Sequence, residues 1–134
     1  MEQKRLCDAA VRMRDSAYAP YSGFTVGAAL LTEDGNIYTG CNIENAAFSP
    51  TVCAERVALF KAVSEGKRRF KALAVAGGKA GETADITPCG VCRQVLSEFS
   101  KPSMPVYLVQ KDGTVKTVTL GELLPFHFSL EETK

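Results

Sequence analysis

The sequence predicts an α/β protein, a three-layer α/β/α sandwich built around a mixed five-stranded sheet. Two observations support this fold class. Segments with helical spacing alternate with short apolar segments, and Asp-Gly pairs separate two pairs of those apolar segments. The 134 residues suffice for one domain with a core and are too few for two. We therefore expect a single domain over residues 1–134, with a mobile tail from about residue 129.

The first part of the chain predicts a surface helix and a β-hairpin. From Glu2 to about Tyr18, apolar residues recur at helical spacing with charged residues between them, which is typical of an amphipathic helix. The apolar segment Val26–Thr32 suits a buried strand, and Asn36–Cys41 returns as a second strand. The pair Asp34-Gly35 between them is a strong hairpin signal.

The segment Asn42–Phe48 is polar and has no clear period, so it is expected to be a loop. Its two amides and one carboxylate suit a polyhydroxylated ligand, but asparagine also caps the backbone in many turns. On composition and spacing alone, backbone capping is the favoured interpretation of this loop.

The next segments predict a second helix and a third strand. Ser49-Pro50 resembles an N-cap followed by proline at the first helical position. We therefore expect a helix from Thr51 to Glu65, ended by Gly66. Lys71–Ala76 follows as a strand, and residues 77–85 are expected to form a polar loop.

The last part of the chain predicts a third helix, a second hairpin and a short final helix. Thr87-Pro88 repeats the Ser-Pro pattern and indicates a helix from about Cys89 to Phe99. Two strands, Met104–Gln110 and Thr114–Val118, flank another Asp-Gly turn. A capping-box spacing then starts a helix over residues 120–124.

The composition excludes several classes of partner. The formal net charge is +1, the basic residues are spread along the chain and tryptophan is absent, so a nucleic-acid platform is not expected. No apolar stretch reaches the roughly 20 residues of a membrane helix, and the charged N-terminus lacks a signal-peptide core. We expect a cytoplasmic protein with reduced thiols that binds neither nucleic acid nor membranes.

Three of the five cysteines lie at the starts of predicted helices. Cys53 follows the Ser-Pro pair, and Cys89 and Cys92 follow the Thr-Pro pair. A helix N-terminus lowers the pKa of a thiol because its unpaired N–H groups favour negative charge. In a reducing compartment, such a set favours metal binding or catalysis over disulfides. If the two helix starts converge, the three thiolates can hold one zinc ion.

Three ligands are one short of a closed structural zinc site and match a catalytic site that keeps one position for water. Glu55 is then a candidate base for that water, and Arg56 a candidate donor to the thiolates. Glu55 also suits a first-turn acid, and Arg56 suits an ordinary surface contact; spacing alone leaves the alternatives for Arg56 even. A fourth ligand from Cys41 or His127 would make the site closed and structural.

At this point the motifs resemble a known family. The pairing of Cys53-Ala-Glu55 with Pro88-Cys-Gly-Val-Cys92 is similar to the zinc-dependent nucleoside and nucleobase deaminases, and within them to the small, all-thiolate cytidine deaminases. The likeness covers almost the whole chain. The other segments that carry it are Tyr18–Ser22, Val26–Leu30, Gly40–Ala47, Lys61–Gly66 and Leu123–Pro125.

The resemblance implies a cytidine deaminase-like fold and hydrolysis of cytidine and 2'-deoxycytidine to uridine and 2'-deoxyuridine with release of ammonia, as in pyrimidine salvage. It implies one zinc ion per subunit, held by Cys53, Cys89 and Cys92. Glu55 would take a proton from zinc-activated water and deliver it to the ring nitrogen and then to the leaving amine. The resulting hydroxide attacks C4 of cytosine.

The resemblance also implies substrate contacts and a shared site. Phe24 would pack near the pyrimidine, and Asn42 and Glu44 would bind the ribose hydroxyls, against the composition-based interpretation of their loop. Ala54 is a further implied substrate contact. Family members of this size are homotetramers, and Phe128 matches the aromatic residue that stacks on the base from a neighbouring subunit.

The chain departs from the family pattern at Phe48, where relatives have tyrosine. A phenol near the sugar is therefore missing, while the packing of the ring is kept. Three other functions stay open at this point. They are a deaminase of another cytosine nucleoside such as an antibiotic, a non-enzymatic zinc module and, more weakly, a nucleic-acid editor.

Overall fold

A computed structural model of the chain describes residues 2–130, so positions 131–134 of the predicted tail lie outside the described residues. The helices are α1 Glu2–Met13, a 3-10 turn Arg14–Ser16, α2 Ala54–Ser64, α3 Gly90–Phe99 and α4 Leu120–Leu123. The strands are β1 Phe24–Thr32, β2 Ile37–Cys41, β3 Phe70–Lys79, β4 Pro105–Val109 and β5 Val115–Thr119.

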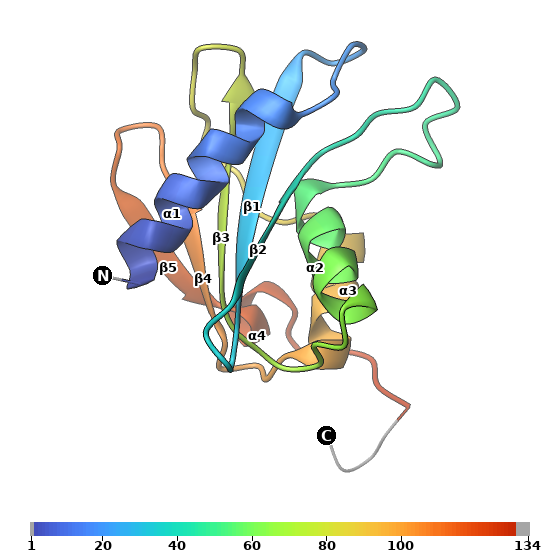
Figure 1. Cartoon of the computed structure of the whole chain (residues 1–134), viewed down its shortest axis with the longest axis vertical. Helices are drawn as coiled ribbons and strands as arrows, with labels where there is room; N and C mark the ends of the chain where they lie inside the picture. Colours follow the sequence, from blue (N-terminus) through green and yellow to red (C-terminus); the bar gives the residue numbers. More distant parts are fainter. Residues whose placement is uncertain (1, 131–134) are drawn as a thin grey trace.

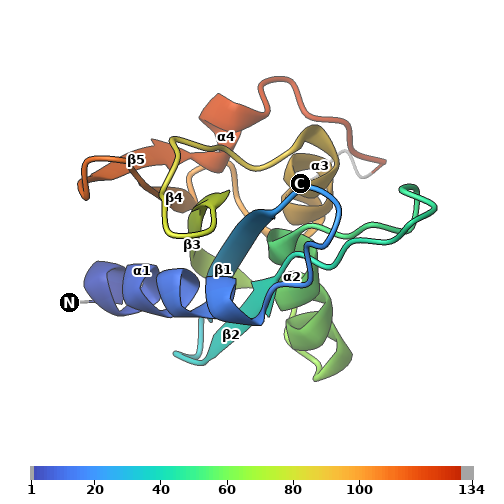
Figure 2. The same cartoon turned by 90° about the horizontal axis from the view of Figure 1, so that it is seen from above.

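The five strands form one sheet in the order β2-β1-β3-β4-β5. Neighbouring strands run antiparallel, except that β3 and β4 pair in parallel. Helix α1 covers one face of the sheet, and α2 and α3 cover the other (Figures 1 and 2). The mixed sheet and the three-layer α/β/α arrangement confirm the predicted fold class.

Each face of the sheet carries its own core, which explains the continuous apolar run of β1. Side chains alternate along a strand, so Ala29 and Leu31 pack towards α1 while Ala28 and Leu30 pack towards α2 and α3. All four side chains are at most 1% exposed. The sheet is therefore buried on both faces and provides a rigid support for the helices that pack on it.

Two glycines allow the helices to approach the sheet closely. A Cβ added at Gly27 would lie 1.9 Å from the Ala10 carbonyl oxygen of α1. A Cβ added at Gly40 would lie 2.4 Å from the Ala54 carbonyl oxygen and 2.5 Å from the Ala58 nitrogen of α2. The first turns of α2 therefore rest directly on β2.

Three predicted boundaries are wrong. Helix α1 ends at Met13, followed by the 3-10 turn to Ser16, instead of at about Tyr18. Helix α2 begins at Ala54 instead of Thr51, because Val52 pairs with Ile43 in an isolated β-bridge, with two N–H···O bonds of 3.0 Å. Strand β3 continues into the expected loop, because Gly77 and its neighbours pair with the start of β1. The last two shifts come from backbone pairing with other segments, which the local sequence does not show.

Candidate metal and substrate site

A cysteine is the N-cap residue of both α2 and α3. Cys53 is the N-cap of α2 and Cys89 the N-cap of α3, each with extended backbone. The Cys89 sulfur accepts a hydrogen bond from the N–H of Cys92 at 3.4 Å. The Cys53 side chain makes no capping hydrogen bond, but both thiols lie at the start of a helix, where the helix dipole favours the thiolate.

The three thiols converge from these two helix starts. Cys53 Sγ lies 3.5 Å from Cys89 Sγ, and Cys89 Sγ lies 3.3 Å from Cys92 Sγ. All three sulfurs lie within 4.8 Å of one another. Zinc–sulfur bonds of about 2.3 Å in a tetrahedron would hold sulfurs about 3.8 Å apart. The spacing therefore fits three ligands of a single zinc ion.

The electrostatics of the cluster agree with that fit. The neighbouring Cys92 thiol and the Arg56 guanidinium lower the pKa of Cys53 to about 5. Hydrogen bonding to Cys53 and burial raise the pKa of Cys92 well above its usual value. Thiols in such close contact resist ionising together unless a cation balances their charge. A divalent ion supplies that balance.

Arg56 lies beside the thiols on the first turn of α2. Its Nη2 is 3.5 Å from Cys53 Sγ, and this contact raises the pKa of the guanidinium. Its Nε is buried and has no hydrogen-bond partner among the described residues. The guanidinium is therefore placed to draw charge from the Cys53 sulfur, as expected for a residue outside the ligand set.

Glu55 is buried in the first turn of α2, only 3% exposed. Burial raises the pKa of its carboxyl to about 7, and the charge of Cys53 adds to the rise. A carboxyl with a pKa near neutral pH can both accept and return a proton. Glu55 thus has the properties of an acid–base group, and its charge interacts with those of Cys53 and Cys92.

The amide of Asn42 is held by the backbone of β1. Its Oδ1 accepts from the Val26 N–H at 2.8 Å, and its Nδ2 donates to the Phe24 carbonyl oxygen at 2.9 Å. This is the backbone capping that composition alone favoured. One lone pair on the oxygen and one N–H remain for a ligand. Phe24 itself, the first residue of β1, is half-buried.

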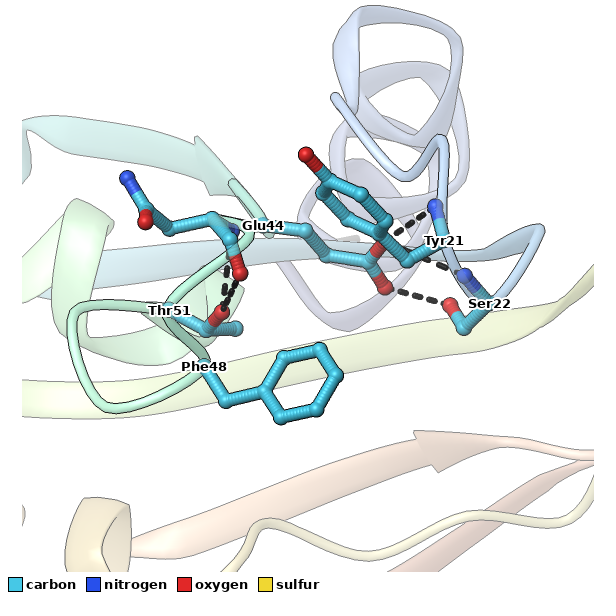
Figure 3. Close-up of a pocket in the computed structure, with 6 residues that line it drawn as sticks. Tyr21, Ser22, Glu44, Phe48 and Thr51 are labelled. Atoms are coloured by element: carbon cyan, nitrogen blue, oxygen red, sulfur yellow. Dashed lines mark hydrogen bonds between the residues drawn. The ribbon is translucent and has the colours of Figure 1, made fainter.

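The carboxylate of Glu44 is held by the loop before β1, as Figure 3 shows. Glu44 Oε1 accepts from the N–H groups of Tyr21 and Ser22 at 2.9 and 3.2 Å, and Oε2 accepts from the Ser22 hydroxyl. The Ser22 hydrogen bond lowers the pKa of Glu44, so the group is an anion at neutral pH. Its position is fixed before any ligand arrives.

A cavity of about 420 Å³ opens between the loop before β1 and the loop that contains Glu44 and Phe48. Its volume is within the size range of small-molecule sites. Phe48 forms its opposite wall, with an exposed ring and a left-handed backbone at φ 65° (Figure 3). None of the thiols lines this cavity. The residues that line it are Tyr21, Ser22, Glu44, Asn45, Phe48 and Thr51.

Four of the predicted substrate contacts do not line this cavity, namely Phe24, Asn42, Ala54 and Phe128. Ala54, the first residue of α2, has a fully buried side chain, so a contact with a ligand falls to its backbone. Phe128 is 67% exposed in the C-terminal segment, and its carbonyl oxygen accepts from Gln94 Nε2 at 3.2 Å. Its ring does not reach the Glu44 cavity of its own chain.

Cys41 and His127, the two candidates for a fourth zinc ligand, do not lie in the cluster of thiols. Cys41 is buried in β2, where burial raises the pKa of its thiol, and it is not in the group of clustered donors found within residues 2–130. His127 lines a separate small cavity with Ser100 and Pro102. The described part of the chain therefore offers an open set of three ligands.

A family model for the zinc-binding region of cytidine and deoxycytidylate deaminases matches residues 1–108. The chain belongs to this deaminase family. A cytidine deaminase from Sporosarcina psychrophila is 54% identical over 132 residues, which cover 98% of this chain and 95% of that protein. The crystal structure of cytidine deaminase from Burkholderia pseudomallei is 47% identical with a TM-score of 0.87, and the likeness covers 96% of this chain and 100% of that one.

A more distant relative is named for a different substrate. A blasticidin-S deaminase from Bacillus cereus is 30% identical over 109 residues, which cover 78% of this chain and 76% of that protein. The family is one of zinc-binding deaminases, and the three-thiol cluster found within residues 2–130 has the donors to hold one metal ion. Within residues 2–130, no helix has the length and apolar composition needed to span a membrane.

The sequence did not single out every residue of the deaminase site. Tyr21 and Ser22 belong to the segment Tyr18–Ser22 that carries the family resemblance, which predicts no role for either residue, yet both hold Glu44. Asn45 and Thr51 line the cavity and bind each other, since the Asn45 N–H donates to Thr51 Oγ1 at 3.0 Å. The available signal was their place in the polar loops that flank the predicted ribose contacts.

Proposed function

We propose that this protein hydrolyses cytidine and 2'-deoxycytidine to uridine and 2'-deoxyuridine with release of ammonia, in pyrimidine salvage. The observation that carries the proposal is the cluster of three thiols beside the buried carboxyl of Glu55. The relatives named cytidine deaminases, at 54% and 47% identity over nearly the whole chain, support it.

Zinc, when held by Cys53, Cys89 and Cys92, supplies a Lewis acid that activates water at neutral pH. The chain's own contribution is proton transfer and orientation. Glu55 accepts a proton from the activated water at its carboxylate and delivers it to the ring nitrogen of cytosine. It then takes a second proton from the hydroxyl newly added at C4, which becomes the carbonyl, and delivers this proton to the leaving amine. Its burial keeps bulk water from competing for these protons.

We assign the sugar to the Glu44 side of the site. The charged carboxylate retains lone pairs beyond those that the loop occupies, and these accept from ribose hydroxyls. Asn42 offers its remaining N–H and lone pair to the same sugar. Phe24 packs near the pyrimidine, the backbone of Ala54 contacts it, and Phe48 closes the sugar side with an apolar ring where relatives have a phenol.

We further propose a homotetramer in the cytoplasm whose sites are shared between subunits. Phe126, Phe128 and Leu130 are 104%, 67% and 88% exposed, an arrangement that a neighbouring subunit would cover. Phe128 then stacks on the base bound by the next subunit. All five cysteines are free thiols, which suits a reducing compartment.

The proposed function is tested by ammonia release from cytidine, with Glu55→Gln and Glu55→Ala as variants. General acid–base groups contribute about 10²- to 10⁴-fold, so we expect a loss of that size in kcat for both variants. Each variant should keep one zinc per chain, because the three thiols are intact. A variant with full zinc and full turnover would contradict the role of Glu55.

Deamination of a nucleoside antibiotic is the second candidate, and the blasticidin-S deaminase relative favours keeping it. The higher identity to cytidine deaminases and the anion at Glu44 on the sugar side favour a plain nucleoside. A panel of cytidine, 2'-deoxycytidine and blasticidin S separates the two. X-ray absorption at the zinc edge, which counts sulfur ligands, separates either enzyme from a structural zinc module.

A further inference from the structure

Arg93, the residue after Cys92, ties together three segments of the chain. Its Nε donates to the Pro88 carbonyl oxygen at 2.7 Å, and its Nη2 donates to Thr87 Oγ1 at 3.0 Å. Its Nη1 donates to the Leu123 carbonyl oxygen, in the last position of α4, also at 2.7 Å. The guanidinium therefore fixes the two residues that precede Cys89 and joins them to the C-terminal helix.

The next residue of α3 extends the same connection. Gln94 Nε2 donates to the Phe128 carbonyl oxygen at 3.2 Å. Arg93 and Gln94 thus hold the C-terminal segment at two points, one at the end of α4 and one five residues later. Figure 1 shows α4 and this segment passing the end of the layer formed by α2 and α3.

The chemistry of arginine suits this position. A guanidinium presents five N–H donors in a rigid plane, so one side chain can serve three acceptors in fixed directions. A lysine ammonium on a flexible stem does not keep that geometry. Two of the three acceptors are backbone carbonyl groups in partly buried hydrogen bonds, and they lose their partner when the guanidinium is removed.

We propose that Arg93 and Gln94 are positioning residues that couple the thiol cluster to the C-terminal segment. Arg93 holds Thr87 and Pro88 so that Cys89 keeps its place as the N-cap of α3 and as a zinc ligand. Gln94 holds the backbone at Phe128. The proposal rests on the proposed function, in which Cys89 binds zinc and Phe128 reaches a substrate.

The test uses the zinc-loaded, full-length protein and two measurements that need no substrate. The first is the rate of zinc release to a colorimetric chelator. The second is the rate of chymotrypsin cleavage after the exposed ring of Phe126. We expect Arg93→Lys to release zinc about 10- to 100-fold faster, the range found when partners of metal ligands are removed. Cleavage should accelerate in the same variant.

Arg68→Lys is the matched control. Arg68 Nη1 also donates to two backbone carbonyl groups, those of Val63 and Lys67, at 2.8 and 2.9 Å. It lies beyond the end of α2 opposite to Cys53, about 16 Å away along the 11 residues of that helix. Arg68→Lys should therefore lower the melting temperature without changing zinc release or cleavage.

Thr87→Ala and Gln94→Ala separate the two halves of the proposal and serve if Arg93→Lys does not fold. Thr87→Ala should accelerate zinc release, and Gln94→Ala should accelerate cleavage alone. Wild-type rates in both would overturn the proposal, as would an Arg93→Lys protein that behaves like Arg68→Lys. If wild-type protein does not deaminate cytidine, the proposed function fails, but these two rates still decide the coupling.

Discussion

Cys53 and Cys89 occupy positions where serine, threonine, asparagine or aspartate usually cap a helix. The Cys89 thiol serves two purposes, because it accepts from an N–H group of the helix start and also belongs to the cluster of three thiols; Cys53 belongs to that cluster without a capping hydrogen bond. Two such caps brought within 3.5 Å of each other place the positive ends of two helix dipoles at one anionic cluster. The site is therefore stabilised by backbone before any further side chain contributes.

Arg56 is predicted to affect activity more than folding. Its contact with Cys53 Sγ reduces the charge on the sulfur, whereas its buried Nε has no hydrogen-bond partner within residues 2–130 and adds little to stability. Arg56→Ala should therefore lower kcat/KM for cytidine about 10- to 100-fold. Thermal unfolding and steady-state kinetics of the same preparation check this. A large fall in melting temperature with normal turnover would contradict it.

Ser22 is predicted to act on substrate binding through Glu44. Its hydroxyl donates to Glu44 Oε2 and accepts from the Phe24 N–H at 3.0 Å, so it links the sugar side to the base side. Ser22→Ala removes one charge-assisted hydrogen bond worth about 1.5 kcal/mol, and we expect KM for cytidine to rise about 10-fold. The change in kcat should be smaller. Steady-state kinetics measure both constants.

Ser49→Ala provides the control for Ser22→Ala. Ser49 lies in the same pair of loops and is exposed, but it does not line the Glu44 cavity. Its variant should keep the wild-type KM. Equal KM values for Ser22→Ala and Ser49→Ala would show that the hydroxyl does not position Glu44.

At the scale of elements, the close packing of α2 on β2 determines where Cys53 and Glu55 lie. Gly40 faces the first turns of α2, and Gly27 on the neighbouring strand faces α1 on the opposite side of the sheet. In both places the atoms that a methyl group would meet belong to the helix backbone. A backbone cannot turn aside as a flexible side chain can, so the helix itself must move.

We predict that Gly40→Ala and Gly27→Ala both destabilise the fold but differ at the metal. Each inserts a methyl into a closed contact, for which about 1–3 kcal/mol of unfolding free energy is typical. Only Gly40→Ala displaces the helix that carries Cys53, so only it should accelerate zinc release. Urea unfolding and chelator assays of the two variants test this. Equal rates of zinc release in both variants would show that the packing of α2 on β2 does not position the metal site.

The elements that could be predicted from sequence are those with local signals. Both Asp-Gly turns, the capping box at Thr119 and Glu122 and the apolar strands follow from short patterns, and the structure contains them. The length of β3 depends on pairing with the start of β1, which is distant in the sequence, and the start of α2 depends on the isolated bridge between Ile43 and Val52. Composition correctly favoured backbone capping for the loop over residues 42–48, because Asn42 and Glu44 both accept from backbone N–H groups of other segments. Their contacts with ribose stay a prediction.

At the scale of the whole molecule, the proposed shared site depends on where the C-terminal segment lies. The thiols, Glu55 and the Glu44 cavity come from α2, α3 and the loops around β1, and residues 126–130 do not line that cavity in their own chain. Figure 1 shows that segment leaving the molecule at the end away from the loop over residues 42–52. Its exposed rings are therefore better placed to contact a neighbouring subunit than to contact the cavity of their own chain.

We predict that truncation after His127 weakens catalysis while zinc binding persists. Stacking of a base on an aromatic ring contributes about 1–3 kcal/mol, so kcat/KM for cytidine should fall about 10- to 100-fold or more. Truncation after Leu130 keeps Phe128 and should retain wild-type kinetics. Mixing is the decisive measurement. A truncated subunit keeps Glu55 and a Glu55→Ala subunit keeps Phe128, so hetero-oligomers of the two impaired proteins should be more active than either protein alone. Unchanged kinetics after truncation, or no recovery on mixing, would argue that each chain works alone.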